Sequence, residues 1–520
     1  MKRILSIAKR AGMLLFATAF AATASAQFLR TAYLQDVPYS LQMNPAQVPS
    51  HGYFSPILGP LSMTLQSNSF GATDIQDLFD KGGDYYQSND FLDKLKSENN
   101  LNLNMSWDQI SFGWFAGNNF YSFNTGTRIE MGATIPKSIF TFMNDMNGNT
   151  FDNDMWKKGL NADLDGERIA MQIYQEIGFG FARKINDKLT VGGKLKLLLG
   201  AANFDFEIKK MEIHTPTGID IDKVQKMGTG APDDPFLNAN LDWSKFKDGG
   251  YKSDAVLQAV RNEIGAHGTA GISVAASGKA SMGGLEWKYE KDAQGNNSYI
   301  NGADMKGFKI SGYGLGIDLG ATYEVMDNLE ITAAITDLGF ISWSKSESKE
   351  VEAKLGENGS VEYNLDQDET TYNSDGTVKA YGLYDFATKV ASNEVVNFDM
   401  LQMEESKSDG YTTSLYTTLA LGGQYTLGDL VVGALYTGRF AKPKTISELT
   451  LSGAYNLSSW LNVALSYSMI QSAGKSFGIG FKAGPIYVGT DYMFFGDNTK
   501  CVNFLAGLSI PLGKGKKFAQ

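Results

Sequence analysis

Apolar and polar residues alternate with a period of two along the stretch from Ser459 to Gln471. The positions between its apolar residues are small or polar, and the apolar residues are Leu461, Val463, Leu465, Tyr467 and Met469. A period of two predicts a β-strand with one apolar face. That face has two candidate environments, the packed interior of a soluble β-sandwich or the hydrocarbon of a membrane.

The same alternation recurs along most of the chain. Fourteen candidate strands lie near residues 60–69, 101–116, 118–134, 169–184, 189–213, 308–325, 329–343, 411–426, 430–439, 446–456, 461–471, 476–483, 486–494 and 502–512. A further pair of small-residue segments, near 268–276 and 280–289, would raise the count to 16. The sequence therefore predicts an all-β fold.

If each strand crosses the membrane once, the connections alternate between its two sides, and their lengths differ between these sides. Short ones at 117, 185–188, 326–328, 427–429, 457–460 and 484–485 fall on one side, and long ones near 70–100, 135–168, 214–307 and 344–410 fall on the other. Outer-membrane barrels combine short periplasmic turns with long outer loops, whereas a soluble sandwich has no reason to sort its connections. The pattern favours an antiparallel transmembrane β-barrel of 14 strands, or of 16 if the additional pair crosses, surrounded by outer-membrane lipid.

Residues 1–26 have the features of a secretory signal peptide. Basic residues precede a short apolar run over 11–22, and Ala24-Ser25-Ala26 supplies a small-x-small cleavage site. The run is too short to serve as a membrane anchor. We therefore expect an exported mature chain that begins near Gln27 and is located in the outer membrane.

The charge of the chain excludes one class of partner. The formal net charge is −11, and removing the four basic residues of the signal peptide lowers it to −15. Binding of nucleic acid needs clustered Lys and Arg, so we expect no nucleic-acid partner. Cys501 is the only cysteine, which excludes an internal disulfide.

If the apolar residues face lipid, the residues between them line the lumen. On the strand at 308–325 these are mainly glycines, which allow close approach of another backbone. The predicted lumen-facing set is Glu176, Lys194, Lys196, Gly312, Gly314, Gly316, Asp318 and Gly320. Charges in such a position must be paired or hydrated. Structural pairing across the lumen is favoured, and a polar path for a solute is the alternative.

The segment 27–59 precedes the first candidate strand and contains several prolines. A rigid segment of this kind predicts a plug inside the barrel, which would then occupy 60–520. The alternative is a disordered periplasmic tail.

Three sequence features together resemble the outer-membrane barrels of the FadL type, with the nearest likeness to a poorly characterised branch of unknown function in the Bacteroidota. They are Asn44-Pro45-Ala46, the hairpin "GFGFARKINDKLTVGGKLKL" and the stretch "GIDLGATYEVMDNLEITAAITDLGFISW". The resemblance implies 14 strands, an N-terminal plug with Asn44, Pro45 and Ala46 as its motif, and uptake of small hydrophobic molecules. Some relatives in the same phylum are instead accessory barrels of secretion or assembly machines.

The sequence offers no catalytic residues and no metal or cofactor site. It contains three histidines and no Gly-x-Ser-x-Gly motif. The acidic stretches "NLDQDET" and "DLDGE" each lack a residue that a calcium loop needs. We therefore expect no enzyme activity, no metal and no cofactor.

Two functions remain. The first is a passive outer-membrane channel for small apolar molecules, with a sideways exit near Asp337-Leu338-Gly339, where the alternation slips and predicts a wall bulge. The second is a non-transporting scaffold that presents its outer loops to protein partners. Between Lys345 and Asp409 the chain has 15 acidic and 6 basic residues, so such partners would meet an acidic surface.

Overall fold

The structure is a computed structural model that describes residues 30–513 with gaps. The gaps lie at 57–58, between 72 and 87, at 146–160 and 215–269, between 292 and 308, at 354–359, between 365 and 402, and at 407, 459, 471–473 and 492–499. The predicted signal peptide, residues 1–26, lies outside the described residues.

Fourteen antiparallel strands of the described chain form a closed ring, which confirms the predicted 14-strand barrel. The first is interrupted and consists of β1 (Gly52–Pro56) and β2 (Leu61–Ser67), and the last consists of β25 (Cys501–Leu508) and β26 (Ile510–Leu512). The ring closes where β2 pairs with β25 and β1 with β26. The others are β3 (Glu98–Ala116), β4 (Asn119–Pro136), β6 (Glu167–Lys184), β7 (Leu189–His214), β11 (Gly312–Met326), β12 (Leu329–Trp343), β19 (Thr418–Leu427) with β18 (Tyr411–Ser414) as its outer part, β20 (Leu430–Arg439), β21 (Ile446–Ser458), β22 (Leu461–Ile470), β23 (Gly474–Ala483) and β24 (Ile486–Thr490).

The additional pair near 268–276 and 280–289 does not belong to the ring. It corresponds to β8 (Ala270–Met282) and the start of β9 (Leu285–Lys291). β8 pairs with the far part of β7, residues 202–214, beyond the part of β7 that pairs with β11. Alternation indicates a strand with one apolar and one polar face, but it does not indicate which strands that strand pairs with. The count of 16 was therefore wrong.

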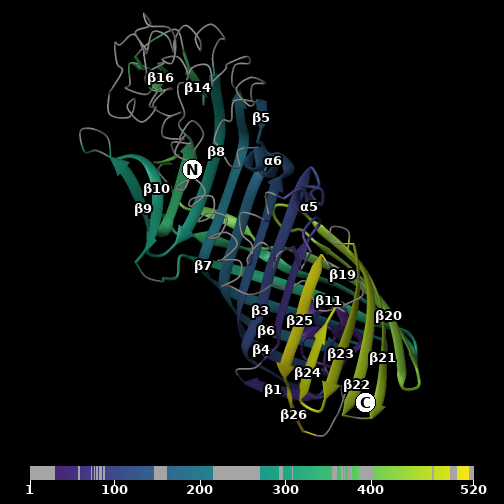
Figure 1. Ribbon diagram of the computed structural model, residues 1–520. Helices are drawn as coiled ribbons and strands as arrows, with labels where there is room; N and C mark the ends of the chain where they lie inside the picture. Colours follow the sequence, from purple (N-terminus) through teal and green to yellow (C-terminus); the bar gives the residue numbers. More distant parts are fainter. Residues whose placement is uncertain are drawn as a thin grey trace, which may run out of the picture.

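Besides β8 and β9, the long connections contain strands that the sequence analysis did not predict (Figure 1). We call the two ends of the barrel the loop end and the turn end, after their connections. At the loop end β8 pairs with β13 (Ser348–Ala353) and β14 (Ser360–Tyr363), and β13 pairs with β17 (Met403–Ser406). Smaller pieces complete this protruding region: β5 (Asn161–Asp163), β10 (Asn297–Met305), β15 (Thr371–Tyr372) and β16 (Val378–Tyr381).

Helices are short. In the described ranges the structure has η1 (Arg30–Leu34), α2 (Ser40–Met43), α5 (Asn89–Leu92), α6 (Lys137–Asp145) and η3 (Lys345–Glu347). Phe91 of α5 and Phe140 of α6 pack together in an apolar cluster at the loop end. No helix in the described ranges is both long enough and apolar enough to cross a bilayer.

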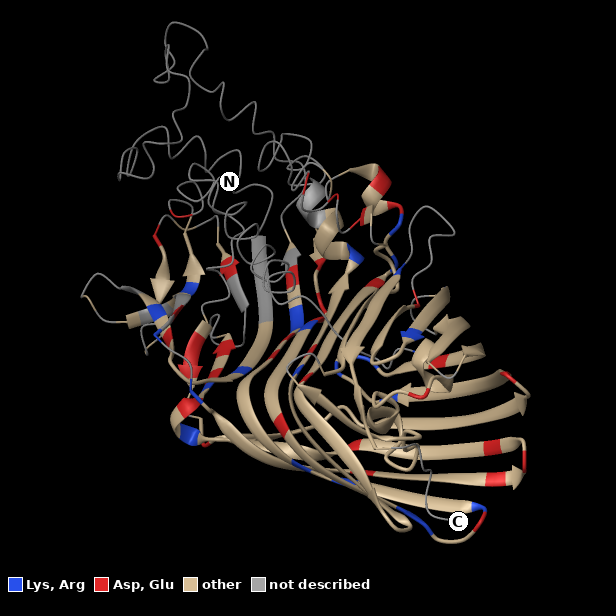
Figure 2. Cartoon of the chain, turned by 90° about the horizontal axis from the view of Figure 1, so that it is seen from below, with Lys and Arg blue, Asp and Glu red and all other residues tan. Residues whose placement is uncertain are grey.

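The wall has an apolar outer face and a polar inner face. On β22, Leu465 is 55% exposed, whereas its neighbours Ala464 and Ser466 are 0% and 5% exposed. Charged residues gather at the strand ends and on the protruding region, and the outside of the wall between them carries few (Figure 2). An apolar belt on a closed barrel is the arrangement that lipid requires, so the protein is an outer-membrane barrel.

The wall begins earlier than predicted. β1 pairs with β3 and β26, so the wall starts at Gly52 rather than at residue 60, and the part of the predicted segment 27–59 that lies outside the wall ends before Gly52. Proline removes a ladder donor, which is why the prolines of this region indicated a non-strand segment. The break between β1 and β2 lies opposite a register shift in β3, and a Cβ on Gly59 would overlap the Asp108 carbonyl oxygen.

Candidate functional site

Residues 30–51, which precede β1, lie inside the barrel. All five residues of η1 are buried, and η1 contacts β20, β21, β22, β23 and β24. Its apolar side chains share one cluster with small inner-face residues of the wall. The cluster contains Ala32, Tyr33, Leu34, Val37, Tyr39, Met43, Ala334, Ala420, Leu435, Ala454, Ala464, Tyr487 and Leu505. Alanine on the wall leaves room for the larger side chains of this lumenal segment, which we define as residues 30–51.

Arg30 links the lumenal segment to the wall by charge. Its Nε lies 2.7 Å from Asp491 Oδ2, and its Nη1 lies 3.2 Å from Glu448 Oε1. The backbone N–H of Arg30 also donates to Asp491 Oδ2 at 3.2 Å. Arg30 is 1% exposed, Asp491 1% and Glu448 2%. Breaking such a buried group of charges leaves unpaired carboxylates in a low dielectric, which is costly.

Asn44, Pro45 and Ala46 lie against glycines of β7 and β11. The Asn44 side chain donates to the carbonyl oxygens of Ala321 and Ala333 at 3.2 and 3.5 Å. A Cβ on Gly320 would overlap Asn44 Oδ1, and one on Gly192 would lie 2.5 Å from the Pro45 carbonyl oxygen. At these two glycines the lumenal segment approaches the wall too closely for a side chain to fit. Whether the three residues act as the motif of a plug stays a prediction.

Asp36, a residue of the lumenal segment, lies near the turn end of the barrel. Its Oδ1 accepts from the Ser50 backbone N–H at 2.7 Å, and Lys482 Nζ donates to its carbonyl oxygen at 2.5 Å. Partial burial raises the pKa of the Asp36 carboxyl, but the Lys482 charge and the Ser50 hydrogen bonds outweigh burial and lower this pKa below its ordinary value.

A layer of charged side chains crosses the lumen beside the lumenal segment. Glu176 Oε1 lies 2.7 Å from Lys194 Nζ and 3.3 Å from Arg128 Nη2, and Arg128 Nη2 lies 2.7 Å from Asp108 Oδ1. Asp108 in turn accepts from Gln42 of the lumenal segment at 3.0 Å. These contacts join β3, β4, β6 and β7 to α2.

Lys196 extends the layer toward β11 and β12. Its Nζ lies 2.7 Å from Asp318 Oδ1 and 2.6 Å from Asp337 Oδ1. Asp318 is fully buried and Lys196 is 4% exposed. The charged layer, as we use the term below, comprises Asp108, Arg128, Glu176, Lys194, Lys196, Asp318 and Asp337. Its members are paired with one another, which satisfies charges that would otherwise be expensive in the barrel interior.

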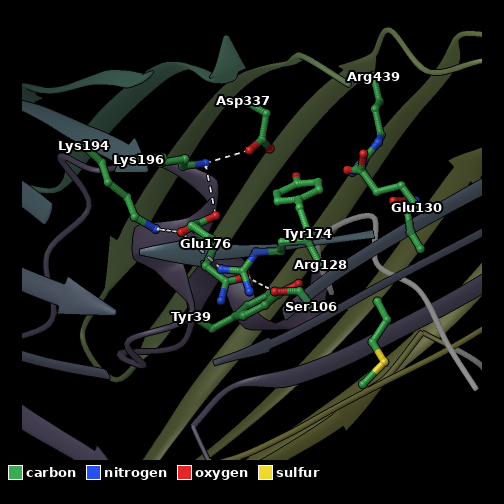
Figure 3. Close-up of a pocket in the computed structure, with 13 residues that line it drawn as sticks. Tyr39, Ser106, Arg128, Glu130, Tyr174, Glu176, Lys194, Lys196, Asp337 and Arg439 are labelled. Carbon is green, nitrogen blue, oxygen red and sulfur yellow. Dashed lines mark hydrogen bonds and ion pairs between the residues drawn. The ribbon is translucent and has the colours of Figure 1, made fainter. Parts of the chain in front are cut away.

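Two small cavities lie between the lumenal segment and this layer. The first has a volume of about 40 Å³ and is lined by residues that include Tyr39, Arg128, Glu176, Lys196 and Arg439 (Figure 3). The second, of about 20 Å³, is lined by Gln42, Asp108 and Lys194 among others. Their polar linings and sizes suit a few water molecules.

An apolar patch lies on the inner wall on the loop-end side of the charged layer. It consists of Tyr174, Leu198, Ile341, Trp343 and Leu415. A Cβ on Gly312 would lie 2.9 Å from the Trp343 ring, and one on Gly314 2.9 Å from Ile341. Gly312 and Gly314 therefore allow close approach of β12, through its backbone as well as its side chains, whereas Gly316 adjoins Leu415 and Lys196. On β6, β7 and β12 alike, the apolar residue lies nearer the loop end than the charged one.

The wall is irregular at Asp337-Leu338-Gly339. Asp337 has a φ of 58°, and the register of β11 with β12 shifts between Ile317 and Leu319. On the other side of β12, the ladder to β18 ends at Ser414 and the ladder to β19 resumes at Thr418. The wall is thus interrupted on both sides of β12 at one height.

Sequence reasoning missed several residues of this site. Arg30, Arg128, Glu130 and Arg439 were not singled out, although Arg128 and Glu130 hold lumen-facing positions in the alternation of the strand at 118–134. Arg439 pairs with Glu130 across the barrel. Their partners are distant in sequence, so alternation places them in the lumen without showing what they contact. In the described part of the chain, no group of three or more His, Cys, Asp or Glu side chains is arranged to hold a metal ion.

Comparisons with known proteins give one family and a set of barrel structures. No curated protein matches the chain. The toluene transporter TodX of P. putida is 11% identical, with a TM-score of 0.37, and the match covers 92% of this chain and 94% of that chain. The toluene transporter TbuX of Ralstonia pickettii is 12% identical, with a TM-score of 0.38 and the same two coverages. A Pseudomonas aeruginosa FadL homologue is 8% identical, with a TM-score of 0.37, and the match covers 94% of this chain and 99% of that chain.

The family model that matches is described as a family of unknown function, DUF5723, and it covers residues 45–491. That range includes the wall from β1 to β24, the charged layer and the apolar patch. Since the match extends over most of the 520 residues, the chain belongs to the DUF5723 family.

Proposed function

We propose that the protein is a passive outer-membrane channel for small apolar molecules, with a sideways exit through the wall at Asp337-Leu338-Gly339. The observation that carries this proposal is the order in which apolar and charged residues follow one another along the inner wall. An apolar patch lies on the loop-end side, the charged layer follows it, and the wall is irregular at the boundary between them.

An apolar solute that entered from the loop end would contact the apolar patch first. To continue along the barrel axis it would have to separate buried ion pairs, which leaves unpaired charges at a large cost. The lipid outside the wall offers an apolar environment at a much lower cost. The charged layer therefore favours a sideways exit over an axial one.

Leu415 is the residue that closes this route in our proposal. It is 2% exposed, belongs to the apolar patch and lies directly after β18, next to the break in the ladder. Its backbone N–H donates to the Gly339 carbonyl oxygen at 3.0 Å. A rotation of this one side chain would open space between the patch and the irregular part of the wall.

In this proposal Leu415 is the first barrier. The lumenal segment is the second, a plug that closes the barrel toward the turn end. Its support is the set of contacts from Arg30, Gln42 and Asn44 to the wall. Because β1 belongs to the wall, a deletion that tests the plug must stop at residue 51. Removing 27–51 is expected to raise ion conductance in planar bilayers.

The channel is tested by uptake of the apolar dye N-phenyl-1-naphthylamine into cells that express the protein. Leu415→Ala is expected to increase uptake several-fold because it enlarges the passage. The matched control is Leu421→Ala, which changes an outward-facing leucine that is 45% exposed on β19. Equal uptake by both variants and by cells without the protein would contradict a channel for apolar molecules.

A non-transporting scaffold is the second candidate. It is favoured by the small size of the two lumenal cavities, about 40 and 20 Å³, and by the sheet that protrudes at the loop end. A scaffold would co-purify with protein partners after extraction in mild detergent and would show the same dye uptake before and after Leu415→Ala.

A further inference from the structure

The loop between β20 and β21, residues 440–445, reaches across the mouth of the barrel. β20 lies seven strands from β3, and β21 lies seven strands from β4, which is half of the fourteen-strand ring. The β20–β21 hairpin and the β3–β4 hairpin therefore face each other across the lumen. Nevertheless, this short loop contacts inner-face residues of β3, β4 and β7.

Three cationic side chains of the loop and its base pair with carboxylates on the opposite wall. Arg439 pairs with Glu130 of β4. Lys442 Nζ lies 2.7 Å from Asp205 Oδ2 of β7, and Lys444 Nζ lies 3.5 Å from Glu98 Oε2 of β3. Asp205 is opposite Ala170 in the β6–β7 ladder, and Ala170 is buried, so this carboxylate belongs to the inner face.

The backbone of the loop also fits the opposite wall. Gly132 of β4 lies on the same inner face as Arg128 and Glu130. A Cβ on Gly132 would overlap the Lys442 carbonyl oxygen and would lie 2.5 Å from Pro443 Cδ. A side chain at position 132 would push the loop away, so the glycine provides a seat for it.

A cavity lies beneath the loop. The cavity of about 40 Å³ is lined by Glu130 and Arg439 on one side and by Tyr39 and Gln42 of the lumenal segment on the other. In Figure 3, the Arg439–Glu130 pair lies on the opposite side of the cavity from Tyr39. Because Gly132, where the loop is seated, is nearer the loop end of β4 than Glu130, the loop lies on the loop-end side of this cavity, which we call the chamber.

We propose that residues 440–445 form a charge-held lid over the outer mouth, which must release from β3, β4 and β7 before a solute can enter. This inference rests on the proposed channel function and adds its outer gate. The pairs at the tip of the lid, Lys442–Asp205 and Lys444–Glu98, differ in exposure from the Arg439–Glu130 pair at its base. The side chains of Lys442 and Lys444 are 50% and 53% exposed, whereas those of Arg439 and Glu130 are each 6% exposed.

This difference gives the lid a defined response to salt. Exposed pairs are screened as ionic strength rises, because the Debye length falls from about 30 Å at 0.01 M to about 3 Å at 1 M. Buried pairs are screened much less. We therefore expect the tip to release at high salt while the Arg439–Glu130 pair stays in place as a hinge. A loop that only stiffens the mouth would not respond in this way.

The experiment measures access to the chamber directly. Ser106, which lines the cavity and donates to Gln42 of the lumenal segment, is changed to Cys in a Cys501→Ser background, and the purified barrel reacts with the neutral reagent 2-hydroxyethyl methanethiosulfonate. The labelling rate is compared between about 0.01 M and 1 M salt. It is expected to rise about tenfold, a size that two exposed ion pairs can account for. The double variant Lys442→Glu, Lys444→Glu is expected to label at the fast rate even at low salt.

Lys475→Glu is the matched control, because it makes the same charge change at an exposed lysine of β23 at the same end of the barrel. Lys442→Gln with Lys444→Gln removes the pairs without adding charge and covers the case in which the Glu variant does not fold, as judged by heat-modifiable migration. Equal labelling of all variants at both salt concentrations would overturn the lid. A labelling rate that responds while dye uptake stays at background would instead overturn the channel and leave the lid standing.

Discussion

Arg30 shows how a single residue connects the lumenal segment to the wall. Its guanidinium contacts carboxylates at the loop-end parts of β21 and after β24, with Asp491 Oδ2 at 2.7 Å. Asp491 also accepts from Ser466 at 3.0 Å and from Asn503 at 2.8 Å. Because the carboxylates are buried, they depend on Arg30 for their neutralisation.

Arg30→Ala is expected to release the lumenal segment. The substitution leaves Glu448 and Asp491 buried without their cation, a loss of about 3–5 kcal/mol by analogy with other broken buried pairs. Single-channel conductance in planar bilayers should increase. Arg183→Ala, at an exposed arginine near the turn end of β6, should leave conductance unchanged, and an equal conductance in both variants would contradict the role assigned to Arg30.

Asp36 makes the stability of the lumenal segment near the turn end of the barrel sensitive to acid. Its pKa in the folded protein is below the ordinary value of 3.8, so the folded state binds fewer protons than the unfolded one. The resulting stabilisation is complete above that ordinary value and is lost as the pH falls through the folded pKa. Since the Asp36 side chain is 42% exposed, the contribution is at most about 1 kcal/mol.

Hydrogen exchange at the Ser50 amide, which donates to Asp36, provides the measurement. After correction for the intrinsic rate, protection of this amide should fall as the pH is lowered from neutral to below the folded pKa. In Asp36→Asn the step should disappear. A step of the same size in both proteins would mean that another group is responsible.

At the scale of elements, the strands of the wall could be predicted because alternation is a local signal. β12 was predicted with the bounds that the structure shows, and the slip in its alternation was visible at Asp337. β1 was missed because Pro56 and the prolines on either side of the strand, Pro49 and Pro60, indicated a break. Of the strands that protrude at the loop end, β8 and the start of β9 were predicted, but as an additional pair of the wall. Others, such as β14, β15 and β16, were missed because they have four residues or fewer, too few for alternation to identify them.

The candidate site could be predicted only in part, for a related reason. Alternation assigns Glu176, Lys194 and Lys196 to one face of their strands, but which charges meet depends on strand order and register. Arg439 and Glu130 are 309 positions apart, and only the closed ring brings them together. The lid was not predicted at all, because a short loop has no periodicity that indicates its destination.

Two neighbouring glycines on β7 test how the lumenal segment fits its strand. Gly192→Ala is expected to weaken docking of the segment, because the new Cβ would lie 2.5 Å from Pro45 backbone atoms. Gly193→Ala is the matched control, since its Cβ would make only ordinary contacts at 3.5 Å or more. Limited proteolysis should cleave the lumenal segment faster in Gly192→Ala alone. Equal cleavage in both variants would contradict close packing at this point.

At the scale of the whole molecule, one arrangement explains both faces of the wall. The barrel leaves no free edge in lipid, its apolar side chains face outward, and its polar side chains pair with each other and with the lumenal segment. The lumenal segment, the lid and the sideways exit all depend on this inside–outside division.

Oxygen accessibility of spin labels along β22 tests this division most directly. One label at a time is placed from Leu461 to Ile470 in the protein reconstituted into lipid, and collision with dissolved oxygen is measured by electron paramagnetic resonance. Our account predicts a period of two with maxima at the outward positions, including Leu465 and Met469, which are 55% and 46% exposed. Maxima at the intervening positions, or equal accessibility on both faces, would contradict a barrel whose apolar side chains contact lipid.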